Sequence, residues 1–126
     1  MDVNIPWVHQ EVEAAFARYE RALTTNDVGV LDELFLASPN TVRYGIGENL
    51  YGHEEIAAFR AARPSTGLMR ALERTAITTY GQDYAVANTL FRRAPGKLGR
   101  QSQCWIRFPE GWRIVSAHVS LIDDPD

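Results

Sequence analysis

The sequence predicts an α+β fold, in which three helices from the first half of the chain pack on a curved antiparallel sheet. Two observations carry this prediction. Apolar residues within residues 1–63 recur at steps of three and four, which is the spacing of one helix face. The second half instead contains four β-branched and aromatic segments separated by short turn sequences, a pattern typical of consecutive antiparallel strands.

Length and composition limit the possible classes of protein. The 126 residues fit one domain, taken as 1–126, because single domains most often have about 100–150 residues. Apolar residues make up 45% of the chain, and the formal net charge is −3, which argues against a nucleic-acid partner because such a partner selects a basic face. The N-terminus has no signal-peptide pattern, and no apolar run approaches the ~20 residues of a membrane span. We therefore expect a cytoplasmic protein with no membrane partner.

The first helix is expected from Pro6 to Asn26. Proline suits the first turn of a helix, where its missing N–H leaves no hydrogen bond unmade. An apolar stripe then follows at three- and four-residue steps: Val8, Val12, Ala15, Phe16, Tyr19 and Leu23. Tyr19 lies within this stripe, so we expect a buried ring whose hydroxyl needs a polar partner.

Two further helices and a small pair of strands come next. Asn26 or Asp27 is a suitable N-cap for a short helix that ends before the sequence ASPN. The segment TVRY (41–44) is a strand candidate, GIGEN is a turn, and NLY (49–51) is the returning strand. A third helix is expected over residues 53–63, because a glycine precedes this segment, glutamates occupy its first turn and a proline follows it.

Four longer strands are expected in the second half of the chain: Leu68–Tyr80, Tyr84–Arg93, Gln101–Phe108 and Trp112–Leu121. The sequences GQD, APGKLG and PEG separate them, and these are turn-forming. Side chains alternate between the two faces of a strand. Ser102 therefore shares a face with Cys104, Ile106 and Phe108, and we interpret this face as the one that points to the core.

Two arginines occupy positions where a positive charge is unusual. Arg43 lies in a short strand, on the side opposite Val42 and Tyr44. Arg63 follows Ile56 by seven residues, which places both on the helix face that points toward the sheet. A guanidinium binds a carboxylate through two parallel hydrogen bonds, so both arginines are candidate anchors for an anion. The alternatives are an edge-strand Arg43 that faces solvent and an Arg63 that only complements the helix C-terminus.

Ser102 and His118 are further candidates for substrate binding. A hydroxyl on a core-facing side needs a hydrogen-bond partner, whereas His118 on the last strand can equally be structural. No His–Asp pair at a suitable spacing accompanies Ser102, so we do not expect a nucleophilic serine. Cys104 is interpreted as a small strand residue, because reactive thiols need an electropositive, partly open setting. The histidines show no metal-ligand spacing, and we expect no metal or cofactor.

Helices followed by a curved antiparallel sheet resemble the nuclear transport factor 2-like superfamily, also called SnoaL-like or cystatin-like, whose sheet is cone-shaped. Three blocks carry a narrower resemblance: RYGIGENLYGHEEIAAFRAARP, LERTAITTYGQDYAVANTLFRR and GRQSQCWIRFPEGWRIVSAHVS. They are similar, in order and spacing, to the AtzH-like family of bacterial cyanuric-acid and oxalurate (ureide) catabolism. This resemblance implies cofactor-free decarboxylation of 1,3-dicarboxyurea, with an essential tyrosine and an essential arginine that fall on Tyr19 and Arg43.

On this hypothesis the substrate is a small anionic ureido dicarboxylate. Arg43 anchors one carboxylate, Arg63 holds the other, and Tyr19 donates a proton. A homodimer is the expected assembly, and functional association with an amidase is a further expectation. Two other functions stay open. One is a non-enzymatic accessory subunit of oxalurate catabolism. The other is a ketosteroid-isomerase-like isomerase or dehydratase, which needs a carboxylate base, and Glu73 is the one acid inside a predicted strand.

Overall fold

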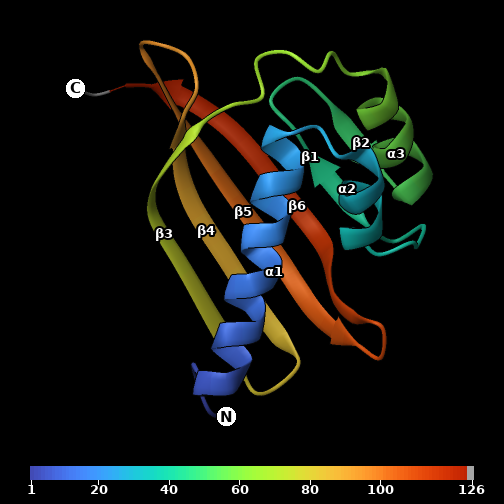
Figure 1. Ribbon diagram of the computed structural model, residues 1–126, viewed down its shortest axis with the longest axis vertical. Coiled ribbons are helices and arrows are strands. Elements are labelled where there is room, and N and C mark those ends of the chain that lie inside the picture. The colour runs from blue at the N-terminus through green and yellow to red at the C-terminus, as the bar shows by residue number, and fades with distance from the viewer. Residues whose placement is uncertain (125–126) are drawn as a thin grey trace.

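Three helices pack on a curved, unclosed sheet of six strands in the computed structural model, which describes residues 1–124 (Figure 1). The helices are α1 (Pro6–Thr24), α2 (Val28–Leu34) and α3 (His53–Ala62), and the strands are β1 (Val42–Tyr44), β2 (Asn49–Tyr51), β3 (Ala71–Tyr80), β4 (Tyr84–Arg92), β5 (Lys97–Phe108) and β6 (Gly111–Asp123). The predicted α+β class is confirmed. Within the described residues, no helix is both long enough and apolar enough to cross a bilayer.

The strand order in the sheet is β2-β1-β6-β5-β4-β3. Strands β3 to β6 form the expected antiparallel meander, and β1 and β2 form the expected hairpin. The hairpin joins the meander through β1, which pairs with β6 in parallel, with Tyr44 opposite His118. The sheet is therefore mixed rather than wholly antiparallel. Parallel neighbours need a long connection, and here β2, α3 and strands β3 to β5 lie between β1 and β6 in the sequence.

The helices begin and end close to the predicted positions. Helix α1 ends two residues early, and Asn26 follows it in the left-handed region with φ 54°. Asp27 caps α2, because its side chain accepts a hydrogen bond from the backbone N–H of Val30 at 3.2 Å. Gly52 precedes α3 with φ 87°, a conformation that side chains with a Cβ rarely adopt.

Strand β5 differs most from the sequence-based expectation. It begins at Lys97, four residues before the predicted start, because Gly99 belongs to the strand and not to a turn. A Cβ at Gly99 would lie 2.2 Å from the ring of Phe91 on the neighbouring strand, so this glycine allows close packing. The residues Gln101, Gln103 and Trp105 are the ones that face the helices.

The expectation that Ser102 and Cys104 point to the core is therefore wrong. Two polar residues, Gln101 and Gln103, lie on the inner side of β5. Hydropathy alone therefore favoured the side of Cys104 and Ile106 as the one that points to the core. The pairing of β5 with β6 also shifts register between Cys104 and Trp105, which is a β-bulge.

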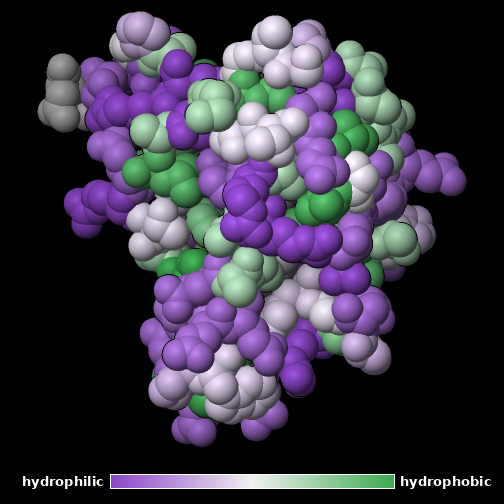
Figure 2. Space-filling view, viewed as in Figure 1, coloured by the Kyte–Doolittle hydropathy of each residue, from purple (hydrophilic) through white to green (hydrophobic). Residues whose placement is uncertain are grey.

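The core lies between the helices and the inner side of the sheet. Its fully buried large side chains include Val8, Val12, Leu31, Phe35, Trp105 and Ile114. The indole N–H of Trp105 donates to Gln103 Oε1 at 3.1 Å, and that of Trp112 donates to Glu11 Oε1 at 2.8 Å. Seen from the side of α1, hydrophilic residues cover most of the surface and hydrophobic ones form small separate patches (Figure 2).

Candidate functional site

A small cavity of about 190 Å³ lies between α1, the β1–β2 turn, the end of α3 and the inner side of the sheet. Its polar lining consists of Tyr19, Arg43, Glu48, Arg63, Arg70, Arg93 and Gln101, and its apolar lining of Leu23, Ile46, Phe59, Leu68 and Val119. Pockets for drug-sized ligands measure about 300–1,000 Å³. This cavity therefore suits a smaller molecule.

Tyr19 reaches the cavity from the buried stripe of α1. It is 3% exposed, and its ring packs on Phe35 with the ring centres 6.3 Å apart. Its phenol interacts electrostatically with the guanidinium groups of Arg60, Arg63 and Arg93. The periodicity of α1 thus places a buried phenol in a strongly positive environment.

Arg43 reaches the same cavity from β1. It is 9% exposed, and its guanidinium lies 5.6 Å from the centre of the Phe59 ring. Its Nη1 donates to Glu48 Oε1 at 2.8 Å, and the other oxygen of Glu48 accepts from the backbone N–H of Gly47. A Cβ at Gly45 would lie 1.7 Å from Glu48 Oε1, the oxygen that binds Arg43, so the glycine permits the carboxylate to fold back over Arg43.

Arg63 lies just after α3, not within it as predicted. Its backbone is extended, with φ −73° and ψ 138°, and its side chain lines the cavity. Burial lowers the pKa of its guanidinium, and the positive charge of Arg43 lowers that pKa further. The Nε and Nη2 atoms are buried without a hydrogen-bond partner among residues 1–124. Buried polar groups are almost always paired, so these two donors are available to an acceptor that enters the cavity, such as water or an anion.

Arg60, in the last turn of α3, is more deeply buried than Arg63. It stacks over Phe35 at 4.7 Å, and its Nη1 donates to Asp32 Oδ1 at 3.2 Å. Burial is the main reason why its pKa is lowered. Arg60 is not among the described residues that line the cavity. We therefore assign it a structural role between α2 and α3.

A second group of polar residues in the cavity was missed from the sequence. Arg70 makes two hydrogen bonds to the carboxylate of Glu20, at 2.9 and 2.7 Å, and a third to Gln101 Oε1 at 3.0 Å. Its guanidinium also lies 4.5 Å from the centre of the Phe91 ring. Arg93 adds a further positive charge, and burial followed by the charge of Arg70 lowers its pKa. The alternation of Gln101 with Trp105 on β5 was the sequence signal that could have identified Gln101.

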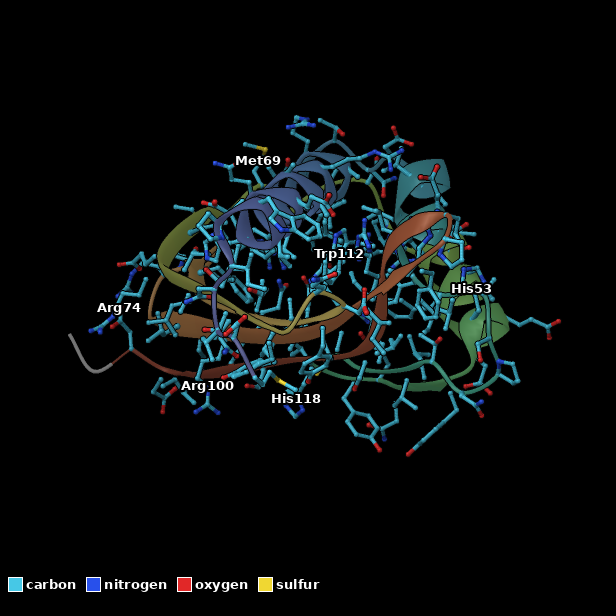
Figure 3. All side chains as sticks on the ribbon, turned by 90° about the horizontal axis from the view of Figure 1, so that it is seen from below. His53, Met69, Arg74, Arg100, Trp112 and His118 are labelled. Atoms are coloured by element: carbon cyan, nitrogen blue, oxygen red, sulfur yellow. The ribbon has the colours of Figure 1, made fainter. Side chains whose placement is uncertain are left out.

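Ser102 and His118 lie on the other side of the sheet and do not line the cavity. Figure 3 shows His118 on the side opposite α1, whereas Trp112 lies on the side of α1. Ser102 and His118 are cross-strand neighbours on β5 and β6. Ser102 Oγ donates to Asn88 Oδ1 at 2.6 Å, and His118 packs edge-on against Tyr44. The structure thus brings Tyr19, Arg43 and Arg63 together and leaves these two residues outside.

The charges around the cavity favour an anion. In the part of the chain that the structure describes, four guanidinium groups line it, and two carboxylates bind to them: Glu48 to Arg43 and Glu20 to Arg70. Two positive charges are therefore in excess. Because these charges are partly withdrawn from water, their attraction for an anion is stronger than at the surface.

The comparisons with known proteins agree with this fold. The family model AtzH-like matches residues 1–125, and no curated protein matches the chain. The chain is 65% identical to a crystallised protein of unknown function from Pectobacterium atrosepticum, with 97% and 96% of the two chains covered and a TM-score of 0.95. It is 48% identical to a cystatin-like fold protein from Burkholderia xenovorans, with 99% of each chain covered and a TM-score of 0.95.

A more distant structural match extends this comparison to the superfamily. The chain is 29% identical to a nuclear transport factor 2-like superfamily protein from Salmonella enterica, with 95% and 94% of the two chains covered and a TM-score of 0.72. The chain belongs to the AtzH-like family of the nuclear transport factor 2-like superfamily.

Proposed function

We propose that this protein is a cofactor-free decarboxylase of a small carboxylated urea of the 1,3-dicarboxyurea type. The observation that carries the proposal is the convergence of Tyr19, Arg43 and Arg63 on one small cavity, with two donors of Arg63 unpaired. A substrate with two carboxylates matches the two positive charges in excess, and the small volume matches its size. The family resemblance supports the same substrate class.

In the proposed complex, the two carboxylates bind to Arg43 and Arg63. Glu48 engages only Nη1 of Arg43 within the described chain, so Nε and Nη2 remain for one substrate carboxylate. Nε and Nη2 of Arg63 form the edge of a guanidinium that suits bidentate binding of the second substrate carboxylate. Two anchors at the two ends fix the substrate between them. Its central carbonyl and nitrogen atoms then lie in the part of the cavity that Tyr19 lines.

The reaction breaks the bond between a urea nitrogen and its carboxylate carbon. CO₂ leaves, and the electron pair of that bond stays on the nitrogen and spreads onto the adjacent carbonyl oxygen. Tyr19 donates a proton to the nitrogen, which gives the monocarboxylated urea, and water then returns a proton to the phenolate. The arginines around Tyr19 stabilise the negative charge during this step, and they accelerate it only as far as they bind the transition state more strongly than the substrate.

An isomerase or dehydratase mechanism has less support in this cavity. Both need a carboxylate that can abstract a proton. The two carboxylates at the cavity, Glu48 and Glu20, are each already bound by an arginine. Glu73, the acid that the sequence offered for this role, binds Arg92 instead.

The test is CO₂ release from freshly prepared 1,3-dicarboxyurea. Tyr19→Phe keeps the ring against Phe35 and removes only the hydroxyl, and we expect a loss of kcat of about 100-fold or more. Arg43→Lys keeps the charge but loses the bidentate geometry, and we expect a marked rise in KM together with a lower kcat. His118→Ala, on the other side of the sheet, is the matched control. Unchanged CO₂ release by the Tyr19→Phe variant would reject the proposed role of this residue.

A further inference from the structure

Gln101 lines the cavity beside the candidate catalytic residues and has a side chain with a fixed orientation. It lies on β5, is 3% exposed, and its Oε1 accepts a hydrogen bond from Nη2 of Arg70. A guanidinium has donors only, so the atom of the amide that meets it must be the oxygen. The NH₂ group of Gln101 is therefore turned away from Arg70.

Arg70 itself has little freedom to move. Its side chain is 1% exposed, both oxygens of Glu20 accept hydrogen bonds from it, and it stacks over Phe91. These contacts hold Arg70 on α1 and on the sheet at once. The orientation of the Gln101 amide is thus imposed by a rigid ion pair.

The Nε2 atom of Gln101 is buried and has no hydrogen-bond partner among residues 1–124. Buried donors are almost always hydrogen-bonded, so this one calls for an explanation. Because Gln101 lines the cavity, a bound ligand can supply the acceptor. An amide donor carries no charge, and the guanidinium groups of Arg43 and Arg63 are better suited to the charged ends of a dianion.

We propose that Gln101 is a further substrate-contacting residue, whose Nε2 donates a hydrogen bond to the neutral carbonyl oxygen between the two carboxylates. This inference rests on the proposed function. The same oxygen receives negative charge as CO₂ leaves, so the hydrogen bond strengthens toward the transition state. Gln101 therefore makes the site specific for dicarboxylates that carry a central carbonyl group.

A pair of small dicarboxylates isolates this contact. In 3-oxoglutarate and glutarate, two carboxylates lie at the ends of a chain of the same length, and only the first has a central carbonyl. The ratio of their dissociation constants, measured by titration calorimetry on fresh solutions, reports the carbonyl contact alone, because the anchoring of the carboxylates cancels. We expect wild-type protein to bind 3-oxoglutarate about tenfold more tightly than glutarate.

Gln101→Met keeps the length of the side chain and removes the donor, so the ratio should fall to about one. Gln101→Glu keeps an acceptor for Arg70 and also removes the donor. The added negative charge weakens the binding of both probes alike, so the ratio of their dissociation constants should again fall to about one. Gln103→Met is the matched control: Gln103 faces the same side of β5 and also has an unpaired Nε2, but it does not line the cavity. Its ratio should stay at the wild-type value.

Different failures separate the two proposals. Two results overturn the role of Gln101 and leave the dicarboxylate site intact. One is a ratio of dissociation constants near one in the wild-type protein. The other is a ratio in folded Gln101→Met protein that equals the wild-type ratio. The melting temperature of each variant checks that it is folded. Failure of both probes to bind wild-type protein overturns the proposed function and the role of Gln101 with it.

Discussion

The layer between α1 and the sheet is packed in two different ways along its length. Around the first half of α1, the side chains of Val8, Val12 and Trp105 are fully buried and apolar. Around the second half, Tyr19 and the unpaired donors of Arg63 border a cavity. The first arrangement stabilises the fold. The second lowers stability, because it keeps charge away from water without a partner, and such a cost is consistent with the binding site that we propose.

The largest expected effect on stability lies at the apolar end. Trp105→Ala removes a fully buried indole, and we expect the free energy of unfolding to fall by about 3–5 kcal/mol. Urea denaturation followed by circular dichroism measures this change. A loss below about 1 kcal/mol would mean that the apolar end is not the main source of stability, and the contrast between the two ends would fail.

A somewhat smaller loss is expected when the ion pair beside the cavity is broken. Arg70→Met leaves the half-buried Glu20 carboxylate without its partner, which should cost about 2 kcal/mol in the same unfolding measurement. The double variant Arg70→Met/Glu20→Gln removes the stranded charge as well. It should regain part of this loss, and a double variant as unstable as Arg70→Met alone would show that packing, not charge, is the cause.

At Arg63, a substitution should raise the free energy of unfolding instead of lowering it. Arg63→Met removes a half-buried charge whose Nε and Nη2 have no partner among residues 1–124, so we expect the protein to become more stable by about 1 kcal/mol while it loses affinity for glutarate. Arg60→Met is the matched comparison three residues earlier. It should destabilise the protein, because it leaves Asp32 unpaired and removes the stacking on Phe35. Destabilisation by both substitutions would remove the distinction between a structural and a functional arginine.

The smallest effects are expected on the opposite side of the sheet. Ser102→Ala and His118→Ala change exposed positions outside the cavity, so each should alter the free energy of unfolding by less than about 0.5 kcal/mol. CO₂ release from 1,3-dicarboxyurea should also be unchanged in both variants. A substantial loss of activity in either one would mean that the reaction involves this side of the sheet as well.

The residues that local periodicity could predict are those whose neighbours follow a clear pattern. The apolar stripe of α1 predicted a buried Tyr19, and alternation in β1 predicted that Arg43 shares its side with Thr41, which is also buried. The register of seven residues from Ile56 directed attention to Arg63, although this residue follows the helix and its extended backbone carries the side chain to the cavity.

The residues that were missed depend on contacts between distant parts of the chain. Arg70 binds Glu20 across 50 residues of sequence, and no local pattern encodes that pairing. Gln101 was overlooked because its polarity suggested the outer side of β5, whereas the ion pair and the cavity supply its polar surroundings. The parallel pairing of β1 with β6 is non-local in the same way.

The decisive experiment is a crystal structure of the wild-type protein with glutarate, which shows whether a dianion binds between Arg43 and Arg63. We expect one carboxylate of glutarate on Nε and Nη2 of Arg63 and the other on Arg43, with the chain of the ligand beside Tyr19 and Gln101. A cavity that contains only water at saturating glutarate, with the donors of Arg63 hydrated, would contradict this expectation.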